Sequence, residues 1–146
     1  MRKILGLVCL LLLIPGIALA APQAQATGAQ PFPKTLINAR YVYVTSYDGD
    51  QFNPNLLAED RQAISAVQNA IQQWGRYIVV YRPADADMIL VVQSRGSEDV
   101  LAVYDARGPH AMASPYLWRA MGREGLQAGE TPLVTQLRQA VEQASK

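Results

Sequence analysis

The chain has 146 residues and a nearly balanced charge, with 13 Lys and Arg, 12 Asp and Glu, and a formal net charge of +1. It carries no block or stripe of basic residues, so no nucleic acid partner is expected. Its one cysteine, Cys9, excludes a disulfide framework. Its one histidine, His110, gives little support to a histidine-based metal site or a Ser-His-Asp relay.

The start of the chain has the three parts of a secretory signal peptide. Arg2 and Lys3 supply positive charge, residues 4–14 form an apolar run, and a Pro-Gly pair then precedes small residues that end at Ala20. A permanent membrane anchor needs about 20 apolar residues, so this run is too short to be one. We therefore predict cleavage near Ala20, a secreted or periplasmic location, and a mature chain without a transmembrane segment.

Composition divides the chain into three parts. Residues 1–20 are the predicted signal peptide, and residues 21–37 form a tether rich in Pro, Ala and Gln, which is expected to be flexible. Residues 38–146 are predicted to form one domain, which is long enough to bury a core of its own.

The first two predicted elements of this domain are a strand and a helix. Residues 39–47 alternate between valine and tyrosine or threonine, which is typical of a strand. Residues 56–75 have a helical period, and Gly75 stands where a left-handed residue ends a helix. The apolar stripe of this helix consists of Ile64, Val67, Ile71 and Trp74, widened by Ala63, Ala66 and Ala70.

Three further β-rich segments follow, at residues 76–81, 88–94 and 100–105. Residues 116–121 are consistent with a short helix or with a fifth strand. The strand is preferred because it gives the segment at 100–105 a partner. A second helix is predicted from Pro132, with Thr131 as its cap and one apolar face. That face consists of Leu133, Val134, Leu137, Ala140 and Val141.

These elements predict an α+β two-layer domain with a mixed sheet of about five strands and two helices, in the order β-α-β-β-β-β-α. The first strand, the first helix and the second strand are expected to make one right-handed βαβ unit. The second and third strands, at residues 76–81 and 88–94, are expected to run antiparallel. The connection between them is shorter than a parallel crossover usually needs.

The stretch from Asp48 to Glu59 partly matches an EF-hand calcium loop. Asp48, Asp50 and Glu59 fall at its first, third and twelfth positions, but Phe52 and Asn53 occupy the fifth and sixth, which need an oxygen ligand and a glycine. No metal site is therefore expected. The stretch is interpreted as a turn leading into a helix with an acidic first turn.

Asparagine side chains close to this turn, Asn53 or Asn55, are expected to cap the helix. The alternative, a small hydrolase or metal-assisted enzyme that uses Asp48, Asp50 and Glu59, stays open.

Aromatic and arginine residues offer a second kind of site. Trp74 lies close to Arg76, and Trp118 precedes Arg119, so each pair could line an aromatic and basic groove or simply fill the core. Asp105 could pair with Arg119 across a hairpin.

The connection at residues 106–115 is longer than a hairpin needs, which is typical of functional loops. No catalytic constellation and no cofactor site are recognised. The residues expected to contact a partner are Arg107, His110, Met112, Trp118 and Arg119.

Over residues 38–144 the succession of "ARYVYV", "DRQAISAVQNAIQQWGRY", "ADADMILVV" and "LWRA" resembles a family of small secreted bacterial proteins of unknown function. More remotely it is similar to small envelope-associated α+β domains, some of them lipoproteins. Cys9 lies too early in the apolar run for lipid attachment, which separates this chain from those lipoproteins.

The resemblance implies export and an α+β fold but supplies no catalytic residues. The expected function is an exported envelope or periplasmic, non-catalytic module that binds a protein partner or a ligand.

Overall fold

The computed structural model describes residues 30–108 and 111–146. The predicted signal peptide and its cleavage position, Cys9 and His110 lie outside the described residues. Within the described ranges, no helix is both long and apolar enough to cross a membrane.

In the part of the chain that the structure describes, the fold has five strands, two helices and three short 3-10 turns. The strands are β1 (Tyr41–Ser46), β2 (Ile78–Val80), β3 (Met88–Arg95), β4 (Glu98–Asp105) and β5 (Trp118–Gly122); the helices are α1 (Ala58–Trp74) and α2 (Pro132–Ala144); the turns are η1 (Lys34–Leu36), η2 (Pro83–Asp85) and η3 (Ala111–Ala113).

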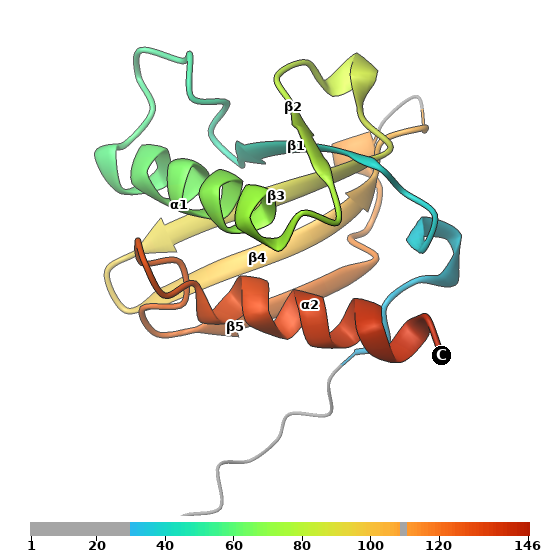
Figure 1. Cartoon of the computed structure of the whole chain (residues 1–146). Helices are drawn as coiled ribbons and strands as arrows, with labels where there is room; N and C mark the ends of the chain where they lie inside the picture. Colours follow the sequence, from blue (N-terminus) through green and yellow to red (C-terminus); the bar gives the residue numbers. More distant parts are fainter. Residues whose placement is uncertain (1–29, 109–110) are drawn as a thin grey trace, which may run out of the picture.

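The strands form one mixed sheet in the order β2-β1-β3-β4-β5, and both helices lie on the same face of it (Figure 1). β1 is parallel to β2 and β3, whereas β4 is antiparallel to β3 and β5. The predicted α+β fold, the order of elements and the fifth strand are confirmed.

The main core lies between the sheet and the helices. Alternate strand residues point toward the helices, because successive side chains of a strand lie on opposite faces. Gly75 ends α1 in a left-handed conformation with φ 74°, as predicted. Trp74, the last member of the predicted stripe, is only partly buried. The buried strand residues of this core are Val42, Val44, Met88, Leu90, Val92, Leu101, Val103, Trp118 and Ala120.

The start of α1 differs from the expectation. The helix begins at Ala58 after Leu57, without a side-chain cap. Asn53 instead orders the preceding loop, where its side chain accepts a hydrogen bond from the Asn55 N–H at 3.0 Å and donates one to the Asp48 carbonyl at 2.9 Å. The prediction that Asn53 or Asn55 caps α1 is therefore wrong.

The expected antiparallel pairing of the second and third strands is also wrong. β2 and β3 do not pair with each other; both are parallel to β1, which lies between them. A short connection suffices because β2 has only three residues, so the chain has little length to retrace. Asp87 closes this crossover, since its backbone N–H donates to the Tyr41 carbonyl at 2.9 Å.

The end of the predicted tether is part of the folded domain. Phe32 and Leu36 are buried in the main core, and Leu36 is 0% exposed. Arg107 and Arg76 hold this segment from two sides by donating to the carbonyls of Thr35 at 3.2 Å and Ile37 at 3.1 Å. The folded domain therefore begins before residue 38.

This packing predicts that Leu36→Ala lowers the free energy of unfolding by about 2–5 kcal/mol, because truncation leaves a cavity in the core. The neighbouring exposed residue supplies a control: Lys34→Ala should change it by less than about 0.5 kcal/mol. Urea denaturation monitored by circular dichroism measures both. An unchanged midpoint for Leu36→Ala would show that this segment does not contribute to the core.

A second prediction concerns the crossover. The Asp87 carboxylate accepts hydrogen bonds from the backbone N–H groups of Arg40 at 2.9 Å and Tyr41 at 3.1 Å, and these bonds lower its pKa below the usual 3.8. A carboxylate whose pKa is lowered by folding stabilises the folded state at pH values above its usual pKa of 3.8. This contribution is lost as the pH falls through the folded-state pKa.

Asp87→Asn should therefore lower the thermal midpoint at neutral pH, and the difference from the unmodified protein should shrink as the pH falls below the usual Asp pKa of 3.8. Asp85→Asn is the matched control, because the Asp85 carboxylate pairs with Arg82 on the surface. A difference that does not depend on pH would contradict this account.

Candidate functional site

The face of the sheet that carries no helix of the described chain is called the open face here. Its floor is apolar and buried, formed by Ile89, Val91 and Ala102 at the centre of the sheet. Strand alternation assigns to the open face Tyr41, Tyr43, Thr45, Ile78, Val80, Ile89, Val91, Gln93, Val100, Ala102, Tyr104, Arg119 and Met121.

Tyrosine side chains cover this floor. Tyr43 donates its hydroxyl hydrogen bond to Asp50 at 3.1 Å, and the hydroxyls of Tyr47 and Tyr104 lie 3.2 Å apart. Burial, with the Tyr47 hydrogen bond, raises the pKa of Tyr104 to about 12, so its phenol stays protonated near neutral pH. The open face thus has an apolar base and a surface of neutral hydroxyl groups.

Arg119 brings a positive charge to the same surface. It lies opposite Ala102 in the register of β4 and β5, and Ala102 lies opposite Val91. Its guanidinium carbon is 5.6 Å from the centroid of the Tyr116 ring, a cation–π arrangement. Its Nε atom is buried and has no hydrogen-bond partner among the residues that the structure describes.

Trp118 lies on the other side of the sheet. It is 3% exposed and belongs to the core beneath the helices, whereas its neighbour Arg119 points to the open face. Trp118 is therefore not exposed to a partner, and its side chain and that of Arg119 lie on opposite faces of the sheet. Asp105 pairs with Arg107 at 2.9 Å, so its predicted pairing with Arg119 is wrong.

The loop after β4 borders the open face. Ala111 packs against its apolar floor, and Met112 is exposed beside it. Arg107 is held by Asp105, and this hydrogen bond lowers the pKa of that carboxyl. Met112 and Arg119 therefore lie at or beside the open face, whereas Arg107 has a structural role in holding the segment before β1. His110 is outside the described residues.

The three acids of the metal-assisted alternative do not converge. Asp48 pairs with Arg95, Asp50 accepts hydrogen bonds from Tyr43 and from the Phe52 N–H, and Glu59 lies in the first turn of α1. In the described ranges, no three His, Cys, Asp or Glu side chains are grouped so that they could hold a metal ion.

Two buried carboxylates fix the end of the sheet. Asp60 is 0% exposed, and it accepts hydrogen bonds from Arg95 at 2.8 Å and from the Ser94 N–H at 2.9 Å. Asp99 accepts from the Ser94 hydroxyl at 2.7 Å and from the Leu126 N–H at 2.9 Å. Asp99 lines a cleft of about 750 Å³ between α1, the β3–β4 turn and the loop before α2. The hydrogen bonds of both carboxylates indicate a structural role.

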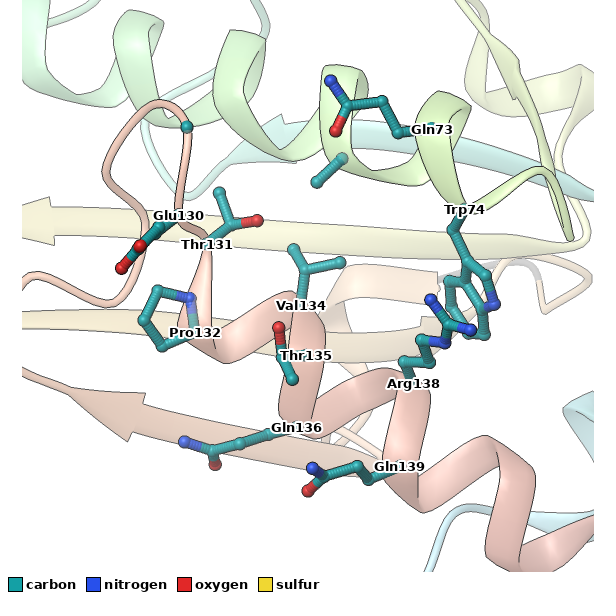
Figure 2. Close-up of a pocket in the computed structure, with 12 residues that line it drawn as sticks. Gln73, Trp74, Glu130, Thr131, Pro132, Val134, Thr135, Gln136, Arg138 and Gln139 are labelled. Carbon is teal, nitrogen blue, oxygen red and sulfur yellow. The ribbon is translucent and has the colours of Figure 1, made fainter.

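A second groove, of about 590 Å³, lies between α1 and α2 (Figure 2). Trp74 stands at one end of it, with the Arg138 guanidinium carbon 5.9 Å from the centroid of its ring and the Tyr77 ring at 5.1 Å. Gln73 and Gln139 contribute amides. The Trp74 indole at this end of the groove is therefore already in contact with neighbouring side chains.

The buried acid predicts an asymmetric mutational response. Asp60→Ala should lower the free energy of unfolding by about 3–5 kcal/mol, because it leaves Arg95 and the Ser94 N–H without their buried partner. Asp48→Ala, which removes the exposed partner of the same arginine, should change it by less than about 1 kcal/mol. Urea denaturation compares the two variants, and equal losses would contradict the assigned roles.

Comparisons of this chain with protein-family models, with curated proteins and with solved structures found no match.

Proposed function

We propose that this protein is an exported, non-catalytic module that binds a segment of a partner protein across the open face. The observation that carries the proposal is that several large apolar side chains are exposed on or beside the strands of this face. Tyr41, Ile78 and Met121 project from its strands, and Tyr47 and Tyr116 border it, all of them exposed. These side chains lie toward both edges of one sheet, and exposed apolar surface rimmed by polar groups marks interaction sites.

The chemistry of the face favours a protein as the occupant. Tyrosine, methionine and arginine are enriched in protein–protein interfaces, since each combines a large contact area with a polar or adaptable group. Tyr43 and Tyr104 are only 7% and 5% exposed, so the centre of the face offers no free rings on which nucleic acid bases could stack. The lack of a basic stripe in the sequence points the same way.

The non-catalytic part rests on how the polar groups of the face are used. Tyr104 has a pKa of about 12, so it is a poor general base near neutral pH. Asp50, a carboxylate that contacts a side chain of the face, accepts hydrogen bonds from the Tyr43 hydroxyl and from the Phe52 N–H. These groups make the face suitable for contact rather than for proton transfer.

The exported part rests on the sequence. Residues 1–20 have the charge, apolar run and small residues of a signal peptide, and the likeness to small secreted bacterial proteins supports the same location. The binding partner would then be an envelope or secreted protein.

Site-specific photo-crosslinking in the cells that express the protein tests the proposed surface. A photoreactive amino acid at position 47 or 121 should form an adduct with one other protein. The same residue at position 136, on the exposed side of α2, should not form it. The adduct should be identified by mass spectrometry, and the purified partner should then bind the unmodified protein and fail to bind Met121→Lys at an unchanged thermal midpoint.

Equal adducts from both faces would contradict the proposal. An adduct of twice the mass of the chain would show instead that the open face joins two copies of it.

A further inference from the structure

We propose that Arg119 is the anchor of this surface and that it binds a carboxylate from an acidic segment of the partner protein. The inference rests on the proposed function and specifies the chemistry of the partner. Its basis is an arginine on the open face that is partly buried, has no ion pair in the described ranges, and has a buried Nε atom without a hydrogen-bond partner there.

Other arginines of the described chain are either satisfied or exposed to water. Four of them pair with carboxylates and two donate to backbone carbonyls; Arg40 and Arg123 are exposed. The first four are Arg82, Arg95, Arg107 and Arg138, and the other two are Arg61 and Arg76. Arg119 combines partial burial with a lack of polar partners. A desolvated charge and an unbonded N–H both destabilise a folded protein unless a partner compensates for them.

The surroundings of Arg119 suit an anion. Tyr116 contacts the guanidinium through its ring at 5.6 Å, and the Nε–H has no acceptor among the described residues. In the hydroxyl pair of Tyr47 and Tyr104, one hydroxyl donates to the other, so one O–H stays available as a second donor. An arginine with nearby hydroxyl donors is the arrangement that recognises a carboxylate by charge-assisted hydrogen bonds.

The position of Arg119 makes it accessible to an extended segment. It lies on β5, which is an edge strand of the five-stranded sheet, with exposed Met121 two residues further along the same face. A partner segment that crosses β5 and β4 would place apolar side chains on Met121 and Tyr116 and an acid at Arg119. Charge complementarity thus specifies an acidic occupant, and the apolar side chains specify that it is a protein segment.

The test uses the mature protein labelled with nitrogen-15, and an oligoglutamate peptide as the probe. Addition of the peptide should shift the side-chain Nε–H resonance of Arg119 and the amide resonances of β4 and β5. An oligoglutamine peptide of the same length should shift neither. Arg119→Gln should weaken binding at least about tenfold, while Arg119→Lys should retain part of it. Arg123→Gln, which removes an exposed charge just after β5, is the matched control and should bind as the unmodified protein does.

Several results would overturn the inference. They are no shift with oligoglutamate, equal weakening in Arg119→Gln and Arg123→Gln, or tighter binding of an oligothymidine strand than of the peptide. The last result would assign the site to a phosphate backbone.

Failure of this inference is distinguishable from failure of the proposed function. If crosslinks from positions 47 and 121 persist unchanged in Arg119→Gln, the open face binds a partner but Arg119 does not anchor it. If these crosslinks are absent in the unmodified protein as well, the proposed surface itself is wrong.

Discussion

Burial of β3 on both faces is the constraint on which the rest of the structure depends. Met88, Leu90 and Val92 of this strand pack under the helices, while Ile89 and Val91 are buried on the opposite face. Two helices on one side of the sheet satisfy only half of this requirement. The other half is met by tyrosine side chains that lie over the sheet, because a tyrosine can cover an apolar floor with its ring and still present a hydroxyl to water.

This solution has a consequence for function. A face covered by a second layer of helices is closed to partners, whereas a face covered by side chains can exchange those contacts for contacts with another molecule. The exposed side chains of Tyr41, Ile78 and Met121 lie around the tyrosine cover rather than on the helices. The surface that completes the core is thus continuous with the surface proposed for binding.

Much of the fold could be predicted from the sequence, because strands and helices leave periodic patterns. The alternation in β1, the apolar stripe of α1, the end of α1 at Gly75 and the start of α2 at Pro132 were sufficient to place these elements. The prediction that β2 pairs with β3 failed for a specific reason. The usual minimum length of a crossover assumes strands of ordinary length, and β2 has only three residues. The buried Phe32 and Leu36 were missed because the surrounding composition is that of a linker.

The candidate site was harder to predict than the fold. Arg119 and Met112 were selected because of a Trp–Arg pair and a long loop, yet the pair is split between the two faces of the sheet by simple alternation. Asp60 illustrates the general difficulty. An acid in the first turn of a helix has the same sequence signature whether it faces water or, as here, is buried and binds Arg95. Only the packing of β3 against α1 distinguishes these two cases.

The two tryptophans also differ in a way that bears on spectroscopy. Trp118 is enclosed in the core, while Trp74 stands partly in solvent at the end of the inter-helix groove beneath a guanidinium group. Their indoles therefore occupy environments of very different polarity, and a dissolved collisional quencher reaches one far more readily than the other. The intrinsic fluorescence of the folded chain thus contains two separable signals, one from its interior and one from the seam between its helices.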